Sequence, residues 1–71
     1  PPAEQSAVLE WLEAHEENFE VTQWYPARSE TDGRRLLRVQ YRYLTPRGRA
    51  VHTDRRFLIE GGHVVGVQSD W

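Results

Sequence analysis

The chain has 71 residues, a formal net charge of −2 and no cysteine. This bounds it to one small domain and excludes disulfide staples, thiolate zinc sites and cysteine nucleophiles. A hydrophobic fraction of 38% with eight aromatic residues excludes a disordered chain. No apolar run approaches the roughly 20 residues of a membrane-spanning helix, and the sequence contains no charged start followed by the apolar stretch that marks a signal peptide.

The first residues, PPAEQ, include no methionine. We expect residues 1–71 to be a single domain taken from a longer protein, with residues 1–5 as a linker or the start of a helix. Residues 1–71 do not specify a compartment.

The first predicted element is an amphipathic helix from Ala3 to about Phe19. Its apolar stripe consists of Val8, Trp11, Leu12, His15 and Phe19. Glutamates fill most of the other face, so residues 1–20 carry a net charge of −6 and residues 21–71 carry +4. An acidic helix and a basic remainder are therefore expected within one domain.

Four strands follow, at about 20–28, 34–45, 49–60 and 63–68. Asp32-Gly33 and Gly61-Gly62 are typical of tight hairpins, and Pro46-Arg47-Gly48 is typical of a type I turn closed by glycine. The predicted fold class is α+β: one N-terminal amphipathic helix packed on a four-stranded antiparallel β-meander, in the order α-β-β-β-β.

The turns predict which residues lie opposite one another. The pairs expected around Pro46 are Tyr43 with Val51, Tyr41 with Thr53, Leu37 with Phe57, Arg42 with His52, and Gln40 with Asp54. Two-residue loops at the other turns pair Trp24 with Tyr41, Ile59 with Val64, and Leu58 with Val65. The layer that faces the helix then consists of Trp24, Leu37, Val39, Tyr41, Tyr43, Val51, Phe57, Ile59 and Val64.

Arg55 does not fit this layer, because its place beside Val39 turns a cation towards the helix. Either a bulge near Asp54 to Arg56 shifts the phase of the strand, or the stem of Arg55 lies along the apolar surface and its guanidinium reaches the rim. Gly66 is expected opposite Phe57, where a missing side chain would let the ring lie flat.

The opposite face of the sheet is the candidate interaction surface. Its candidate residues are Leu36, Arg38, Gln40, Arg42, His52, Asp54, Arg56, Leu58, Val65 and Val67, with Val21, Gln23, Tyr25 and Leu44 around them. The pattern predicts an apolar patch on this face, made of Leu36, Leu58, Val65 and Val67. Either the patch contacts a partner or another copy of the chain, or C-terminal residues that include Trp71 cover it.

His52 and Asp54 share a strand face and could form a base with its orienting carboxylate, or two metal ligands. A third ligand is hard to place, so a polar network of Arg38, Arg42, His52 and Asp54 is favoured. Ser6, Ser29 and Ser69 lie at a helix start, in a loop and in a tail, without a nucleophile elbow. We therefore predict no enzyme, no catalytic residue, no cofactor and no metal.

The stretch VQYRYLTPRGRAV, followed by DRRFLIEGGHVVGV, resembles the last strands of cystatin-like and NTF2-like domains, in which a helix rests in a curved antiparallel sheet. The resemblance covers about residues 36–68 and rests on strand order, an aromatic-rich central strand and a Gly-Gly hairpin. The Gln-x-Val-x-Gly loop of cystatin inhibitors is missing, as are the extra helices of NTF2-like pockets. The resemblance therefore implies neither protease inhibition nor catalysis.

The function expected from these patterns is a non-catalytic accessory or protein-interaction module of a larger, bacterial protein. It would contact another protein, or another domain of the parent chain, through the open face or the edge strand at 63–68; a second copy is an alternative partner. The alternative function is nucleic-acid binding by Arg38, Arg42, Arg56 and Tyr25, against which the negative net charge argues. A further alternative is a small-ligand or metal site at His52 and Asp54.

Overall fold

The structure, a computed structural model that describes residues 2–69, has one helix followed by four antiparallel strands in one sheet. The elements are α1 (Pro2–His15), β1 (Glu20–Arg28), β2 (Arg35–Leu44), β3 (Ala50–Glu60) and β4 (His63–Ser69). The strand order is β1-β2-β3-β4, so β1 and β4 form the two edges. The predicted α-β-β-β-β meander is confirmed.

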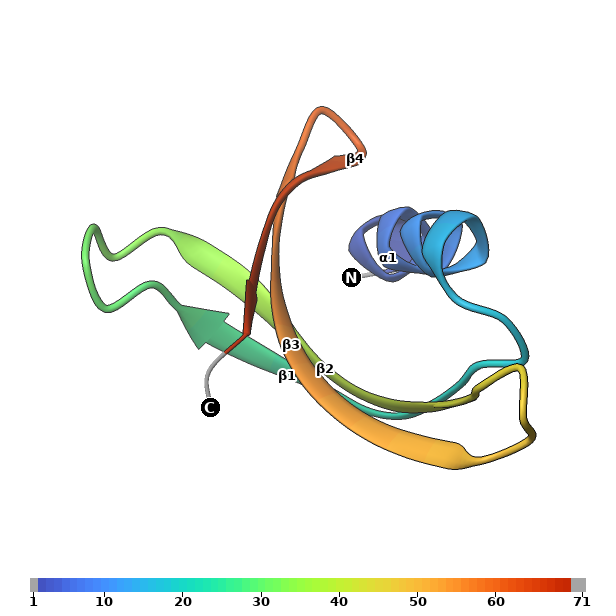
Figure 1. Cartoon of the computed structure of the whole chain (residues 1–71). Coiled ribbons are helices and arrows are strands. Elements are labelled where there is room, and N and C mark those ends of the chain that lie inside the picture. The colour runs from blue at the N-terminus through green and yellow to red at the C-terminus, as the bar shows by residue number, and fades with distance from the viewer. Residues whose placement is uncertain (1, 70–71) are drawn as a thin grey trace.

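The sheet is strongly curved, and α1 lies on its concave side (Figure 1). The core between them is made of Val8, Leu12, Leu37, Val39, Tyr41 and Phe57, none of which is more than 7% exposed. Trp11, Phe19, Val21, Trp24, Tyr43, Ile59 and Val64 pack around this cluster. No helix among residues 2–69 is long and apolar enough to cross a membrane.

The helix ends earlier than the apolar stripe predicts. It stops at His15, and Asn18 adopts a left-handed conformation with φ of 50° that cannot continue a right-handed helix. Phe19 still reaches the core from the connection to β1. His15 is exposed; its ring stacks on the Trp11 ring with a centroid distance of 4.0 Å.

The pairing of β2 with β3 is the predicted one in every pair. The turn that sets it is closed by Thr45 N–H, which donates to Arg49 C=O over 2.8 Å, with Gly48 at φ of 79°. The confirmed pairs are Leu37 with Phe57, Gln40 with Asp54, Tyr41 with Thr53, Arg42 with His52, and Tyr43 with Val51.

The predicted pairing of β1 with β2 is wrong. Asp32-Gly33 lies within a longer loop that runs from Ser29 to Arg34 and is closed by Ser29 N–H donating to Arg34 C=O. Trp24 consequently pairs with Val39 instead of Tyr41. The observed register differs from the predicted one by two residues. Because side chains alternate between the faces of a strand, Trp24 keeps its predicted face and still packs against the core.

A bulge in β1 corrects the prediction for Val21. The register shifts between Val21 and Gln23, and the extra residue reverses the alternation of faces along the strand. Val21 therefore lies opposite Tyr41 and packs against the core instead of lying on the open face.

A second bulge, in β4, corrects three further predictions. Ile59 pairs with Val64 as expected, but Leu58 pairs with Gly66 because Val65 is the extra residue. Phe57 pairs with Val67, so Gly66 does not lie opposite the Phe57 ring and Val67 shares the helix-facing side with Phe57. Val65 is 55% exposed and Val67 is 39% exposed, so both are accessible at this edge.

Candidate interaction face

The candidate site is the convex face of β2 and β3, called here the open face. It presents the side chains that alternate with the buried ones along the two strands: Leu36, Arg38, Gln40, Arg42, His52, Asp54, Arg56 and Leu58. These predicted residues are brought together. Val65 is the extra residue of the bulge in β4 and lies apart from them, whereas Val67 still borders a depression that Leu36 and Leu58 line. Leu36 is only 5% exposed.

The centre of the open face is a hydrogen-bonded network around the carboxylate of Asp54. Arg38 Nε donates to both carboxylate oxygens, at 2.9 and 3.0 Å, and Arg38 Nη2 donates to Oδ2. Gln40 Nε2 donates to the same Oδ2 over 3.0 Å. A planar guanidinium matches a carboxylate in this way, so the three side chains hold one another in place.

Tyr25 on β1 extends this network. The guanidinium carbon of Arg38 lies 5.3 Å from the centroid of the Tyr25 ring, a cation–π distance. Arg38 therefore lies against the ring and is also held by Asp54. Tyr25 is 38% exposed, but the contact with Arg38 occupies ring surface that a nucleic-acid base would need for stacking.

The network lowers the pKa of Asp54 below its usual range. The hydrogen bond from Arg38 is the main cause, and the one from Gln40 adds to it, although partial burial acts in the opposite direction. Arg38 and Gln40 occupy the two oxygens of the carboxylate, and none of these hydrogen bonds involves His52. This argues against Asp54 as the orienting partner of a catalytic histidine.

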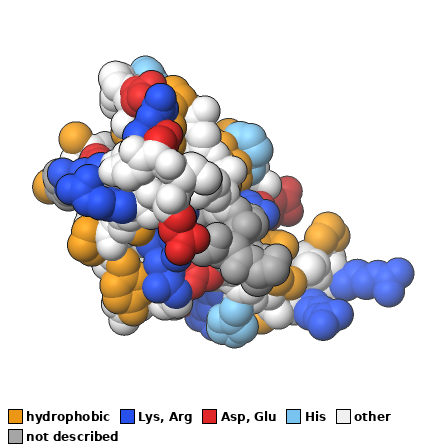
Figure 2. Space-filling model, turned by 90° about the vertical axis from the view of Figure 1, so that its left-hand side faces the viewer, with side chains coloured by type: hydrophobic (Ala, Val, Ile, Leu, Met, Phe, Trp, Pro, Cys, Tyr) orange, Lys and Arg blue, Asp and Glu red, His pale blue; other side chains and the backbone are white. Residues whose placement is uncertain are grey.

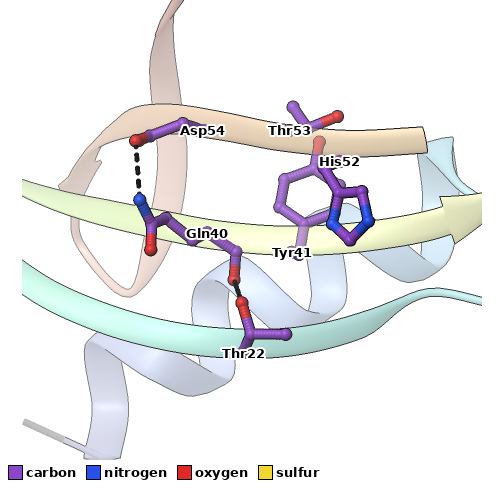
Figure 3. A pocket seen from close by; sticks show the side chains of 6 residues that line it. All are labelled: Thr22, Gln40, Tyr41, His52, Thr53 and Asp54. Carbon is purple, nitrogen blue, oxygen red and sulfur yellow. Dashed lines mark hydrogen bonds between the residues drawn. The ribbon is translucent and has the colours of Figure 1, made fainter.

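His52 lies apart from the network. It forms no hydrogen bond or ion pair within residues 2–69, and in Figure 3 its ring lies away from the dashed lines that join Gln40 to Asp54 and to Thr22. Arg42, its cross-strand neighbour, pairs with Glu20 over 2.8 Å instead. The predicted network is thus confirmed for Arg38 and Asp54 and is wrong for His52 and Arg42.

A shallow depression of about 490 Å³ opens at this place, lined by Thr22, Gln40, Tyr41, His52, Thr53 and Asp54 (Figure 3). Of these side chains, Thr22 and His52 are exposed and can form hydrogen bonds with a partner. Within residues 2–69 no three His, Asp or Glu side chains come close enough to hold a metal ion. His52 and Asp54 would be at most two ligands of such a site.

The apolar end of the open face is smaller than predicted. Leu36 and Leu58 line a second depression, of about 190 Å³, between the β1–β2 loop and β4, together with Gly66 and Val67. The alternative that Trp71 covers this patch concerns a residue outside those that the structure describes.

The sequence placed Arg55 beside Val39 on the concave face but did not predict what its guanidinium contacts there. Arg55 lies opposite Val39 without a bulge; its Nη1 donates to Tyr41 Oη over 3.0 Å, and its guanidinium carbon lies 5.8 Å from the Trp11 ring centroid. Burial raises the pKa of Tyr41 to about 12. The sequence held a signal for this contact. Tyr41 was predicted to pair with Thr53, and Arg55 lies two residues further along the same strand face, within diagonal reach of Tyr41.

Comparisons with protein-family models, with curated proteins and with solved structures found no match to this chain.

Proposed function

We propose that this chain is a non-catalytic accessory module, part of a larger protein, that binds a partner protein through the open face. The observation that carries the proposal is the network of Tyr25, Arg38, Gln40 and Asp54 on a face that α1 leaves uncovered (Figure 1). Side chains held in place before binding lose little conformational entropy when a partner docks, and Tyr and Arg are frequent at binding hot spots.

Binding is favoured over catalysis because the groups that could do chemistry are not arranged for it. The carboxylate of Asp54 is engaged by Arg38 and Gln40, and His52 has no carboxylate partner within residues 2–69. The depression beside them is shallow and lies on the surface of a sheet, where water would not be excluded from a reaction.

Nucleic-acid binding is the weaker alternative. Arg38 is neutralised by Asp54 and Arg42 by Glu20, so these two of the four predicted contact residues offer a polyanion little net positive charge. On the side that faces left in Figure 1, acidic and basic side chains lie next to one another (Figure 2). A protein surface with both donors and acceptors complements such a face better than a row of phosphates does.

A photo-crosslinking amino acid in place of His52 tests the proposal, since this exposed side chain makes no contact that the fold needs. The same amino acid in place of Glu30, in the β1–β2 loop, is the control. After irradiation in an extract of the source cells, we expect a specific protein to be joined at position 52 and not at position 30.

The crosslinked protein, once identified and purified, is then titrated into the isolated domain. Arg38→Ala and Asp54→Ala should each weaken binding by roughly tenfold or more, as the loss of a charge-assisted hydrogen bond at a hot spot does. Arg47→Ala, which removes the same charge far from the network, should not. Equal binding by all four proteins would refute the proposal.

A salt titration against single-stranded RNA tests the alternative. Micromolar affinity that falls steeply with salt, and that weakens with Arg38→Ala and Arg42→Ala, would replace the protein-binding proposal with a nucleic-acid one.

A further inference from the structure

The β2–β3 turn carries Arg47 and Arg49, whose guanidinium groups have no hydrogen-bond or ion-pair partner among the residues that the structure describes. Both side chains are exposed. Other arginines of the chain do have such partners: Arg34 with Asp32 and Glu60, Arg35 with Glu4, Arg38 with Asp54, and Arg42 with Glu20. Leu44, at the end of β2 beside this turn, is 41% exposed.

Two glutamates at the end of α1 also have charged groups without a partner among the residues described. Glu13 lies in the last turn of the helix and Glu17 follows it in the connection to β1. Both are exposed, and neither carboxylate has a hydrogen-bond or ion-pair partner among the residues described. Their charges are therefore available to a second molecule.

The topology places these two clusters at the same end of the molecule. Glu20, the first residue of β1, pairs with Arg42 near the end of β2, so the α1–β1 connection and the β2–β3 turn adjoin one end of the sheet. Both lie on the right-hand side of Figure 1. A two-fold axis through this end would bring the acidic cluster of one copy onto the basic turn of the other, and the reverse at the same time.

We propose that the chain forms a symmetric dimer through this end. Leu44, Arg47 and Arg49 of each copy would contact Glu13 and Glu17 of the other. The second copy is the partner that fits because the chain itself carries the surface of complementary charge. This proposal goes beyond the binding role of the open face and uses different residues.

Exposed ion pairs are individually weak and are screened by salt, so the dimer should be weak and salt-dependent. Sedimentation equilibrium at about 10 mM and about 1 M salt compares Debye lengths of roughly 30 and 3 Å. At low salt and protein concentrations up to about 1 mM, the average mass should rise from 8.4 kDa towards twice that value. At high salt it should stay at the monomer value.

A pair of charge-reversed variants makes the test specific. Arg47→Glu with Arg49→Glu leaves both surfaces acidic, and Glu13→Arg with Glu17→Arg leaves both basic. Each double variant alone should associate at least about tenfold more weakly than the parent. An equal mixture of the two should associate again, because both contacts then join opposite charges.

Glu30→Arg, in the β1–β2 loop, is the matched control; it should dimerise like the parent chain. Thermal melts followed by circular dichroism establish that every variant is folded. A parent chain that stays monomeric at low salt would overturn the proposal. A dimer that survives both double variants would overturn it as well, and so would a mixture that fails to recover. In either case the copies would associate through another surface.

Discussion

Arginines lie on both faces of the central strands, and a comparison of Arg38 with Arg55 shows what each face can supply. On the open face, Arg38 meets the carboxylate of Asp54 and the amide of Gln40 holds the same carboxylate. On the concave face, Arg55 meets only the neutral hydroxyl of Tyr41 and the ring of Trp11, and its buried Nε has no partner within residues 2–69. One arginine is neutralised, whereas the other remains a partly buried cation.

This difference assigns separate tasks to the faces. The concave face supplies most of the stability, through Val8, Leu12, Val39 and Phe57, each of which is 0% exposed. The polar network of the open face adds less, because its groups exchange bonds with water for bonds with one another. Changes on the concave face should therefore be costly, and changes on the open face should affect binding more than folding.

Phe57→Ala should have the largest effect. The ring is completely buried and meets the edge of Trp11 at a centroid distance of 5.2 Å, so its removal leaves a cavity in a small core. We expect a loss of about 3 to 5 kcal/mol in the free energy of unfolding, measured by urea titration. Leu44→Ala, at a position that is 41% exposed, is the control and should cost far less. Comparable losses for the two variants would show that the core is wrongly placed.

Tyr41→Phe should have an intermediate effect. It removes the hydroxyl that accepts the hydrogen bond from Arg55 and leaves the guanidinium with one partner fewer, at a cost of about 1 to 3 kcal/mol.

The same variant should also change the response to alkali. The pKa of Tyr41 rises from 10.0 to about 12 on folding, so the folded state favours the neutral phenol and stability should fall as the pH rises between these values. The chain has no lysine, and arginine stays charged, so few other groups titrate there. Tyr41→Phe should flatten this fall in stability; an unchanged fall would contradict the burial of Tyr41.

Asp54→Asn should have the smallest effect on folding. The side chain of Arg38 is 37% exposed and can be rehydrated when its partner is lost. The pKa of Asp54 is lowered in the folded state, so its contribution is present above the ordinary aspartate pKa and is lost as the pH falls through the lowered value. Urea titrations between about pH 2 and pH 5 should therefore show a shallower acid dependence for Asp54→Asn. Equal slopes for Asp54→Asn and the parent would contradict the network.

The sequence predicted the fold where local rules were sufficient. The helical stripe, the four strands and the register of β2 with β3 follow from periodicity and from one turn of well-defined chemistry at Pro46 to Gly48. The network of Arg38 and Asp54 then follows as well, because its members lie on neighbouring pairs of that register.

The errors arose at the two edge strands. A bulge inserts a residue without a residue type that announces it, so the phases of β1 and β4 could not be read from alternation, and Val21 and Val67 were assigned to the wrong face. The loop from Ser29 to Arg34 is held by side-chain bonds, such as Arg34 N–H donating to Asp32 Oδ1, which compete with the two-residue hairpin that Asp-Gly favours.

The assignment of the aromatic side chains to the two faces can be tested directly with the three tyrosine rings. With ring-labelled tyrosine, a neutral paramagnetic chelate in the solvent broadens the NMR signals of exposed protons. Tyr41 is 1% exposed and Tyr25 is 38% exposed, so the Tyr41 signals should stay sharp while those of Tyr25 broaden. Equal broadening of Tyr41 and Tyr25 would place the Tyr41 ring in solvent and contradict the separation of an apolar, helix-covered face from a polar, open one.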